Sequence, residues 1–317
     1  MATYKEIHGV NVQYRESDAT AIEGDVWYNA STGKLKMYSA LGSWASGGTM
    51  NTGASLITGT GSQTAGLSAG GEVGPPSTYG NSEEYNGSSW TAGGNLTSAR
   101  AQLASTGSAG SQTAALCFLG RTAPGSVALV EQYDGSSWTE IADCNTARRE
   151  SPGGSGTTTA CVAFAGGEAL AITESWNGTS WTEVADLNTG REYVADAGDS
   201  GTSALCIGGG PSATDVVETW NGTSWTEVGD LNTARKILSG AGGTTAALAF
   251  GGGPPNVAIT EEWNGSSWAE VADLPTAKTD GAGTGTSSLA LSFGGGGPVD
   301  TTEEWSMAAA VQTVAFD

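Results

Sequence analysis

Short apolar runs alternate with segments rich in glycine, serine and threonine along most of the chain, and none of these runs has a helical period. Clear examples are "TAALCFLG", "TTAALAFGGG" and "SSLALSFGGGG", each of which ends in glycine. Short apolar runs bounded by turn residues are typical of strands, and abundant glycine and threonine disfavour helices. The pattern therefore predicts an all-β protein.

The strand pattern repeats every 43 to 48 residues, and the stretch "EEWNGSSWAEVADLPTAK" at residues 261–278 has four close copies upstream. Each unit is interpreted as four strands: a small-residue strand, an apolar strand ending in glycine, a strand ending in an aromatic residue, and a strand beginning with tryptophan. Repeats of this length are typical of propeller blades. The aromatic anchors are Tyr85, Tyr133, Trp176, Trp220, Trp263 and Trp305 on the third strand and Trp44, Trp90, Trp138, Trp181, Trp225 and Trp268 on the fourth.

Asn-Gly or Asp-Gly separates the two aromatic residues of each complete unit. This pair predicts a type I′ hairpin turn, in which both central residues have positive φ. The flanking aromatic residues can then pack between neighbouring units. In the second unit Arg121 follows Gly120, which breaks the double glycine. The apolar strands end at six glycines: Gly70, Gly120, Gly166, Gly209, Gly252 and Gly295.

The two ends of the chain complete one unit between them. The last unit stops after its third strand at Trp305, whereas a single "GSW" strand around Trp44 precedes the first complete unit. Joining these strands in one sheet removes open edges. We therefore expect a six-bladed β-propeller over residues 43–306, with its ring closed by the N-terminal strand near Trp44 joining the C-terminal blade. Residues 1–42 would form a β-hairpin attachment segment and residues 307–317 a C-terminal tail.

The repeat resembles the kelch motif. A double glycine after an apolar strand, an aromatic residue, a turn and a tryptophan match that motif over roughly residues 43–306. The resemblance implies a kelch-like propeller, a fold used mostly as an interaction platform and by some enzymes. Kelch-type copper oxidases need several histidine and tyrosine ligands, so that activity is not carried over to a chain with one histidine. The fold alone does not decide the function.

The charge of the chain excludes two classes of partner. There are 33 acidic and 12 basic residues, which gives a formal net charge of −21. Such a surface repels phosphates and anionic lipids, and no apolar run is long enough to span a bilayer, so we expect no nucleic acid partner and no membrane insertion. The N-terminus also lacks the pattern of a secretory signal. The four cysteines, expected to be reduced core residues, are Cys117, Cys144, Cys161 and Cys206.

The sequence offers little for catalysis. Its one histidine, His8, lies outside the repeats, which excludes a histidine metal cluster or a Ser-His-Asp triad within them. Adjacent carboxylates such as Glu261 and Glu262 point to opposite faces of a strand and cannot form a two-carboxylate site alone. We therefore predict no catalytic residue, no metal ligand and no cofactor.

A basic residue follows "NTA" or its variants at the start of most units, and two interpretations of it remain open. It forms a structural salt bridge between blades, or it belongs to a ring that grips an acidic ligand. These basic residues are Arg100, Arg148, Arg191, Arg235 and Lys278, and their candidate partners are Glu131, Glu174, Glu218 and Glu262 or Asp143, Asp186, Asp230 and Asp273.

One face of the predicted ring varies more than the other. The loops after the double glycine and the loops holding "TAR" emerge on the same side, and the former differ from unit to unit. Variable loops on a rigid scaffold commonly carry recognition. The residues predicted to bind a partner lie on the two longest loops: Pro75, Pro76, Tyr79, Arg121 and Pro124.

The stretch "GDVWYNASTGKLKMY" at residues 24–38 resembles one found in phage tail-fibre and other virion proteins. The resemblance implies a non-enzymatic virion component, made in the host cytoplasm, that is attached to other virion proteins by residues 1–42. Its propeller would contact a host-surface glycan or protein, and the chain could form a homo-oligomer. The alternatives are a head-decorating protein, and a cellular kelch adaptor or carbohydrate-active propeller. For residues 1–42 the alternative is an ordinary hairpin that caps the propeller.

Overall fold

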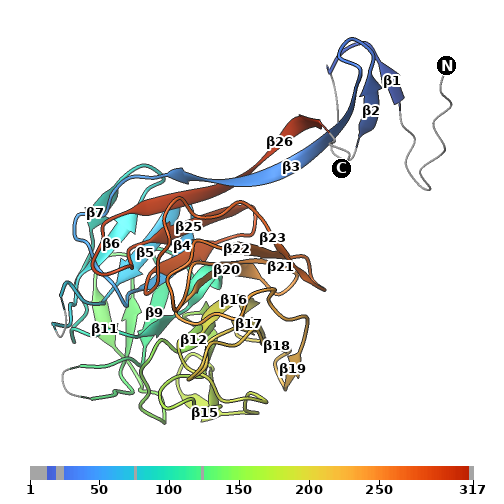
Figure 1. Ribbon diagram of the computed structural model, residues 1–317. Coiled ribbons are helices and arrows are strands. Elements are labelled where there is room, and N and C mark those ends of the chain that lie inside the picture. Colours follow the sequence, from blue (N-terminus) through green and yellow to red (C-terminus); the bar gives the residue numbers. More distant parts are fainter. Residues whose placement is uncertain (1–12, 19–24, 75–76, 123–124, 314–317) are drawn as a thin grey trace. The chain divides into compact units, whose positions relative to one another are not determined.

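Strands dominate the computed structural model (Figure 1), which describes residues 13–18, 25–74, 77–122 and 125–313. The one helical element in these ranges is a 3-10 turn, η1 (Gly107–Ala109), so the prediction of an all-β protein is confirmed. Within the same ranges there is no helix that could cross a membrane. The chain divides into a smaller unit, Met1–Ser43 with Ser306–Asp317, and a larger unit, Trp44–Trp305.

Five of the sheets have four antiparallel strands each and use consecutive segments of the chain. Repeated sheets of this kind are the architecture of propeller blades. Sheet 1 contains β4 (Thr58–Ser62), β5 (Ala65–Ala69), β6 (Ser82–Tyr85) and β7 (Trp90–Ala92). Sheet 2 contains β8 (Ala104–Ser105), β9 (Ala115–Phe118), β10 (Val130–Tyr133) and β11 (Trp138–Glu140). Sheet 3 contains β12 (Gly153–Thr157), β13 (Ala160–Phe164), β14 (Thr173–Trp176) and β15 (Trp181–Glu183).

The later repeats follow the same plan. Sheet 4 contains β16 (Ala195–Ser200), β17 (Ser203–Ile207), β18 (Val217–Trp220) and β19 (Trp225–Glu227). Sheet 5 contains β20 (Ser239–Gly243), β21 (Ala246–Phe250), β22 (Thr260–Trp263) and β23 (Trp268–Glu270). Sheet 6 has six strands, in the order β1 (Gln13–Arg15), β2 (Val26–Asn29), β3 (Lys34–Ser46), β26 (Thr302–Thr313), β25 (Leu289–Phe293) and β24 (Ala282–Gly285).

A cross-strand aromatic pair flanks the hairpin turn of each four-stranded sheet. The ring centroids of these pairs are 4.9 to 5.5 Å apart, within the range of favourable aromatic contact. The pairs are Tyr85–Trp90, Tyr133–Trp138, Trp176–Trp181, Trp220–Trp225 and Trp263–Trp268. All of these rings are buried, so the aromatic residues of the repeat belong to the core.

The fourth-strand tryptophans also connect different sheets through their indole N–H groups. Four of them donate to a serine or threonine on the third strand of a neighbouring sheet: Trp44 to Thr260, Trp90 to Thr302, Trp138 to Ser82 and Trp225 to Thr173. Valine occupies the acceptor position at the other two boundaries. Trp181 packs in one core cluster with Val130 and Trp268 in another with Val217, and both buried indole nitrogens have no hydrogen-bond partner.

The Asn-Gly turns differ from the predicted type I′ geometry. Tyr85 pairs with Trp90, so four residues form the loop, and the asparagine Oδ1 of Asn86 accepts hydrogen bonds from the backbone of Ser88 and Ser89. Gly87 has a φ of 88°, whereas the asparagine is not among the described residues with positive φ. The type I′ prediction is wrong because the asparagine side chain, rather than a second positive φ, closes the turn.

Two consecutive residues with positive φ mark the end of each second strand, and in four of the six sheets they are a double glycine, such as Gly251 at 67° and Gly252 at 101°. The equivalent pair is Leu119 and Gly120 in sheet 2, at 65° and 96°, and Ala165 and Gly166 in sheet 3, at 61° and 107°. The sequence suggested a break at Arg121, whereas the structure has it at Leu119 and at Ala165. All four cysteines are free and buried, as expected from the sequence.

In the described part of the smaller unit, β1 runs parallel to β2, and β2 forms an antiparallel hairpin with β3. Trp27 is fully buried there, and its indole N–H donates to Asp18 at 3.2 Å. The Arg15 guanidinium lies 5.0 Å from the centre of the Trp27 ring. Residues 307–313, which were expected to form a tail, continue β26.

Candidate ligand-binding site

The repeated arginines form buried structural ion pairs. Their side chains are at most 2% exposed, and each donates from a terminal guanidinium nitrogen to a glutamate on the third strand of the next sheet at 2.8 to 3.1 Å. The other terminal nitrogen donates to backbone carbonyls, as in Arg191 to Gly208 and Val216. The pairs are Arg100–Glu131, Arg148–Glu174, Arg191–Glu218 and Arg235–Glu261, and Lys278 pairs with Glu303 in the same way.

These contacts decide between the two interpretations of the repeated basic residues. Burial lowers the pKa of Arg148 and Arg235 from the ordinary value, and both remain paired with a carboxylate. Because these guanidinium groups are almost fully buried and are paired with glutamates, an acidic ligand cannot reach them, and the structural salt bridge is the correct interpretation. In the fifth repeat the partner is Glu261, whereas the sequence suggested Glu262, which is only half-buried.

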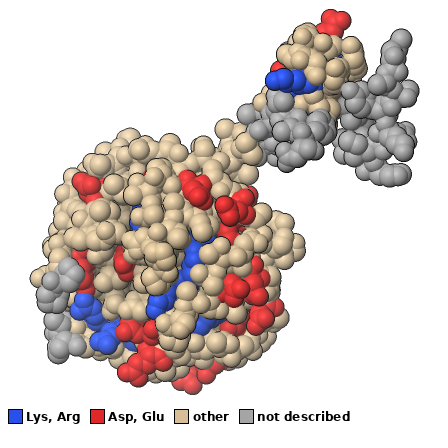
Figure 2. Space-filling model, in the orientation of Figure 1, with Lys and Arg blue, Asp and Glu red and all other residues tan. Residues whose placement is uncertain are grey.

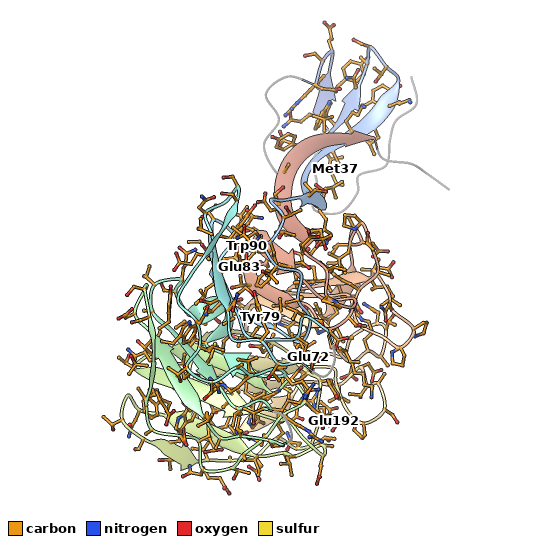
Figure 3. All side chains as sticks on the ribbon, turned by 90° about the vertical axis from the view of Figure 1, so that its left-hand side faces the viewer. Met37, Glu72, Tyr79, Glu83, Trp90 and Glu192 are labelled. Carbon is orange, nitrogen blue, oxygen red and sulfur yellow. The ribbon has the colours of Figure 1, made fainter. Side chains whose placement is uncertain are left out.

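The structure describes two of the five residues predicted to recognise a partner. Arg121 forms an ion pair with the buried carboxylate of Glu72. Tyr79 is half-buried, and burial raises the pKa of its phenol above the ordinary value. Figure 3 labels Tyr79 and Glu72, which both lie in the segment that follows β5. The other three, Pro75, Pro76 and Pro124, lie outside the described residues.

A different set of residues forms the most regular feature of this unit. Just before the first strand of each sheet, one non-glycine residue has a φ between 52° and 66°. We call this set the collar; its members are Leu56, Gln102, Glu150, Tyr193, Ile237 and Asp280. Left-handed backbone costs a side-chain-bearing residue on the order of 1–3 kcal/mol, and such strain is concentrated at functional sites. The collar is thus a candidate site on backbone geometry alone.

Backbone hydrogen bonds join successive collar residues from different repeats. Gln102 N–H donates to the Leu56 carbonyl at 3.0 Å, and Ile237 N–H donates to the Tyr193 carbonyl at 2.9 Å. Tyr193 N–H donates to the Glu150 carbonyl at 2.7 Å, and Leu56 N–H donates to the Asp280 carbonyl at 2.7 Å. The left-handed backbone at each member allows these groups to meet.

The side chains of the collar differ in all six repeats, and so do the residues just before them, whereas the aromatic pair and the hairpin turn between its members recur in the five complete repeats. Five of the six lie two residues after the repeated basic residue, and Leu56 lies two residues after Ala54, which stands at that position in the first repeat. This constant spacing with changing residue type was visible in the sequence. It was missed because these segments were read only as small-residue strands.

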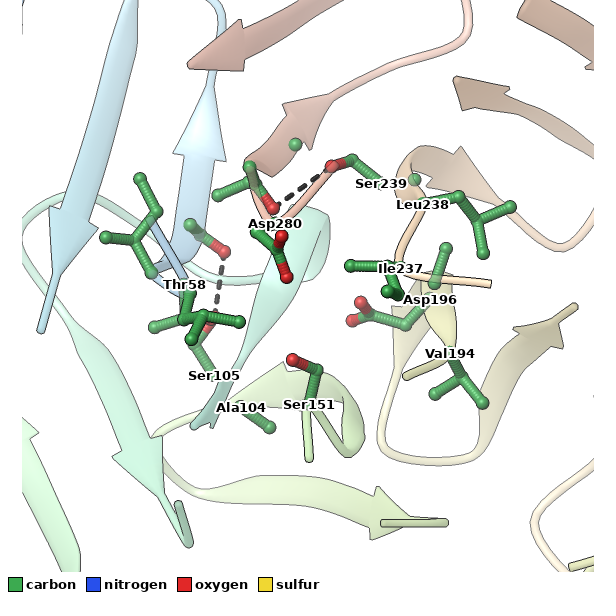
Figure 4. A pocket seen from close by; sticks show the side chains of 18 of the residues that line it. Thr58, Ala104, Ser105, Ser151, Val194, Asp196, Ile237, Leu238, Ser239 and Asp280 are labelled. Carbon is green, nitrogen blue, oxygen red and sulfur yellow. Dashed lines mark hydrogen bonds between the residues drawn. The ribbon is translucent and has the colours of Figure 1, made fainter. Parts of the chain in front are cut away.

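A cavity of about 60 Å³ lies beneath the collar (Figure 4), and the first strands of all six sheets or the residues just before them contribute to its wall. Asp196 and Asp280 point into it, and Ser151 lies opposite them. Ile57 and Leu103 add apolar surface. The described wall of this collar cavity contains no lysine, arginine or histidine.

The two aspartates of the collar cavity have perturbed acidity. Asp196 keeps some exposed surface in the cavity, but protein surrounds it, and this burial raises its pKa to about 7 despite a hydrogen bond from the Gly154 N–H at 3.3 Å. Burial also raises the pKa of Asp280, which accepts a hydrogen bond from Thr279 Oγ1 at 2.9 Å. Loss of water without a compensating cation is the cause in both cases.

Polar side chains on and next to the collar also interact with one another. Gln102 Nε2 donates to the Tyr193 hydroxyl at 3.2 Å, and the Lys236 ammonium lies 5.6 Å from the centre of the Tyr193 ring. Glu192 is desolvated and hydrogen-bonds the carboxyl group of Glu150, and both effects raise its pKa. In Figure 2 basic side chains of the larger unit gather toward a hollow, with acidic side chains around them.

The 3-10 turn η1 separates this cavity from a second one. Ser105, just before η1, lines the collar cavity, whereas Ser108 and Ala109 of η1 line the second, which has a volume of about 330 Å³. Ser108 Oγ accepts a hydrogen bond from the Gly242 N–H at 3.3 Å, which ties η1 to sheet 5. The second cavity contains Asp199, whose carboxylate accepts hydrogen bonds from Thr244.

The described residues contain no group of three or more histidine, cysteine, aspartate or glutamate side chains that could hold a metal ion. In comparisons with known proteins, no family model and no curated protein matches the chain.

Proposed function

We propose that this chain is a non-enzymatic recognition protein of a phage virion, built on a closed six-bladed, kelch-like β-propeller that binds its partner through the collar. The observation that carries the recognition role is the collar itself. Its six side chains all differ, although they stand on a repeated scaffold and at equivalent strained positions. Variable residues on a fixed frame are typical of binding surfaces.

Closure of the six blades is supported by hydrogen bonds between the first and the last repeat. Thr284 Oγ1 in β24 donates to the carbonyl of Gly61 in β4 at 2.7 Å. Trp90 in sheet 1 donates to Thr302 in sheet 6 at 2.9 Å. The order of strands in sheet 6 also has β3 next to β26, as a ring closed by the strand near Trp44 would require.

The virion assignment is supported by the resemblance of residues 24–38 to a segment of phage tail-fibre proteins. In this proposal residues 1–42 attach the chain to other virion proteins, and the propeller is presented to a host-surface glycan or protein. Assignment to the tail rather than the head follows the same resemblance. A head-decorating protein would have the same fold without a need for a variable collar.

The proposal is tested by asking whether the native chain co-purifies with virus-sized particles and where gold-labelled antibody binds on them. Label at the tail is the expected result. Label over the head would instead identify a head-decorating protein. Recovery of the protein only in the soluble fraction would overturn the virion proposal. As a control, a chain without residues 1–42 should remain soluble and folded but fail to enter particles. Its incorporation would contradict the proposed role of that segment.

A further inference from the structure

Asp196 and Asp280, which are partly buried, have no cationic partner, whereas most buried glutamates of the larger unit have one. The exception is Glu83, whose carboxylate accepts hydrogen bonds from Asn51 and Thr52 instead. Glu131, Glu174 and Glu218 are each paired with an arginine. Neither cavity aspartate takes part in a described ion pair, and the wall around them contains no described basic residue. A buried carboxylate without a cation is costly, so proteins retain one mainly where a ligand or proton completes it.

The size of the collar cavity restricts what could enter. A volume of about 60 Å³ corresponds to about four to six water molecules, since each needs roughly 10–15 Å³ on this measure. A hexose has roughly twice as many heavy atoms and exceeds this volume. A chain of four or five heavy atoms fits within it. The cavity is therefore suited to a slender group and not to a ring.

The chemistry of the wall is divided in a way that matches such a group. Carboxylates of Asp196 and Asp280 and the hydroxyl of Ser151 offer hydrogen-bond acceptors to a donor in the cavity. Ile57 and Leu103, which also line the cavity, are nearly fully buried and offer apolar contact.

We propose that the collar cavity binds a primary ammonium group carried on an unbranched aliphatic stem. This inference rests on the proposed recognition role of the collar face and names the chemistry of the group recognised there. The ammonium has three donors and no acceptor, which suits a pocket whose described polar side chains include two carboxylates and a hydroxyl. Its positive charge supplies the cation that Asp196 and Asp280 lack, and the methylene stem packs on the apolar wall.

Apart from Asp280, the charged groups on and next to the collar include both carboxyl groups and cations, and none of them lines the cavity. Glu150 and Glu192 bring two carboxyl groups close to Tyr193, whose pKa they raise together with burial. Lys236 is held by the Pro211 carbonyl at 2.9 Å, and Arg149 lies 3.5 Å from a carboxylate oxygen of Glu150. These two cations are thus engaged outside the cavity and leave its aspartates available.

The inference is tested by titrating the purified full-length protein with n-butylammonium and following backbone amide shifts by NMR. Saturable binding is expected, with n-butanol, of the same length but without charge, binding at least tenfold more weakly. Asp196→Asn should weaken butylammonium binding at least tenfold. The matched control is Asp199→Asn in the second cavity, which should leave the affinity within about twofold of the unaltered protein.

Equal binding of butanol, or an unchanged affinity in Asp196→Asn, would overturn the inference. If Asp196→Asn fails to fold, Asp280→Asn replaces it, and the comparison of butylammonium with butanol tests the inference on the unaltered protein. Nα-acetyl-lysine methylamide and 1,4-diaminobutane then separate the two sources of such a group, a lysine side chain of a partner protein or a free polyamine. Because these probes are small molecules, their binding does not depend on particles, and failure here would leave the virion proposal standing.

Discussion

The indole N–H of Trp138 donates a hydrogen bond to Ser82 Oγ at 3.3 Å, from the fourth strand of sheet 2 to the third strand of sheet 1. The equivalent indole of Trp181 has no partner, and Val130 stands at the position of Ser82. The repeat thus contains its own comparison of a satisfied and an unsatisfied buried donor. A buried polar group left without a partner costs on the order of 1–3 kcal/mol.

Replacing the valine should satisfy the orphaned indole. We expect Val130→Thr and Val217→Thr each to raise the free energy of unfolding by about 0.5–1.5 kcal/mol, because threonine supplies the acceptor already used at Thr173 and Thr260. Urea unfolding followed by tryptophan fluorescence measures this. Thr173→Val is the reverse control and should destabilise the protein. A loss of stability in both valine variants would show that burying the hydroxyl destabilises the fold more than the new hydrogen bond to the indole stabilises it.

The buried ion pairs should be sensitive to removal of one partner. Arg191→Met leaves the Glu218 carboxylate buried and without its cation, so we expect a loss of about 3–5 kcal/mol in the free energy of unfolding. Adding Glu218→Gln should recover part of that loss, since it removes the uncompensated charge. Thermal unfolding of the single and double variants gives the comparison. A single variant as stable as the unaltered protein would contradict the structural role of these pairs.

The raised pKa of Asp196 predicts how stability depends on pH. The pKa of an aspartate in the unfolded chain is about 3.9, whereas burial raises the pKa of Asp196 in the fold to about 7. Between these values only the folded state holds the proton, so the free energy of unfolding falls as pH rises from about 4 to about 7. Asp196→Asn removes this contribution, at most about 4 kcal/mol at 1.4 kcal/mol per pKa unit.

Urea unfolding at pH 4.5 and pH 7.5 provides the measurement for Asp196. The variant should lose less stability than the unaltered protein between the two values, because the raised pKa values of Asp280 and Glu192 contribute equally in both chains. Parallel pH profiles would mean that Asp196 is already ionised in the folded protein at neutral pH.

The hairpin turns should accept aspartate in place of asparagine. Asp134 closes the turn of sheet 2 with the contacts that Asn177 makes in sheet 3, and its hydrogen bonds from Ser136 and Ser137 lower its pKa to about 2. Asn177→Asp should therefore change stability by no more than about 0.5 kcal/mol, whereas Asn177→Ala loses the acceptor and should cost about 1 kcal/mol. Calorimetry of the two variants provides the measurement. Equal stability of Asn177→Asp and Asn177→Ala would contradict a role of the side chain in closing the turn.

Much of the fold could be predicted because the same pattern of strands and turns recurs in each repeat. Strand order, the aromatic pairs and the glycine-marked strand ends follow from local patterns that packing does not override. The turn type could not be predicted from Asn-Gly alone, because the length of the loop decides whether the asparagine backbone or its side chain closes it. Glu261 and Glu262 are adjacent in sequence, and only the strand's orientation shows which of them meets Arg235.

The candidate site was harder to predict from the sequence. Tyr79 and Arg121 were predicted to bind a partner because they lie on the longest loops, but Arg121 forms an ion pair with Glu72. Positive φ at residues such as Gln102 and Tyr193 has no local signature, since neither is a glycine or asparagine. The collar becomes visible only when the repeats are compared in the structure, where backbone N–H groups of collar residues donate to the carbonyls of collar residues in the neighbouring repeat.

The central claim is that the collar carries recognition, and competition for adsorption of particles to host cells tests it most directly. Purified protein should block adsorption. A collar variant with Gln102→Ala and Tyr193→Ala should not, and Asn177→Asp on a hairpin turn should block as well as the unaltered chain. All three proteins must show the same thermal unfolding. Equal blocking by the collar variant would place recognition elsewhere and contradict the account.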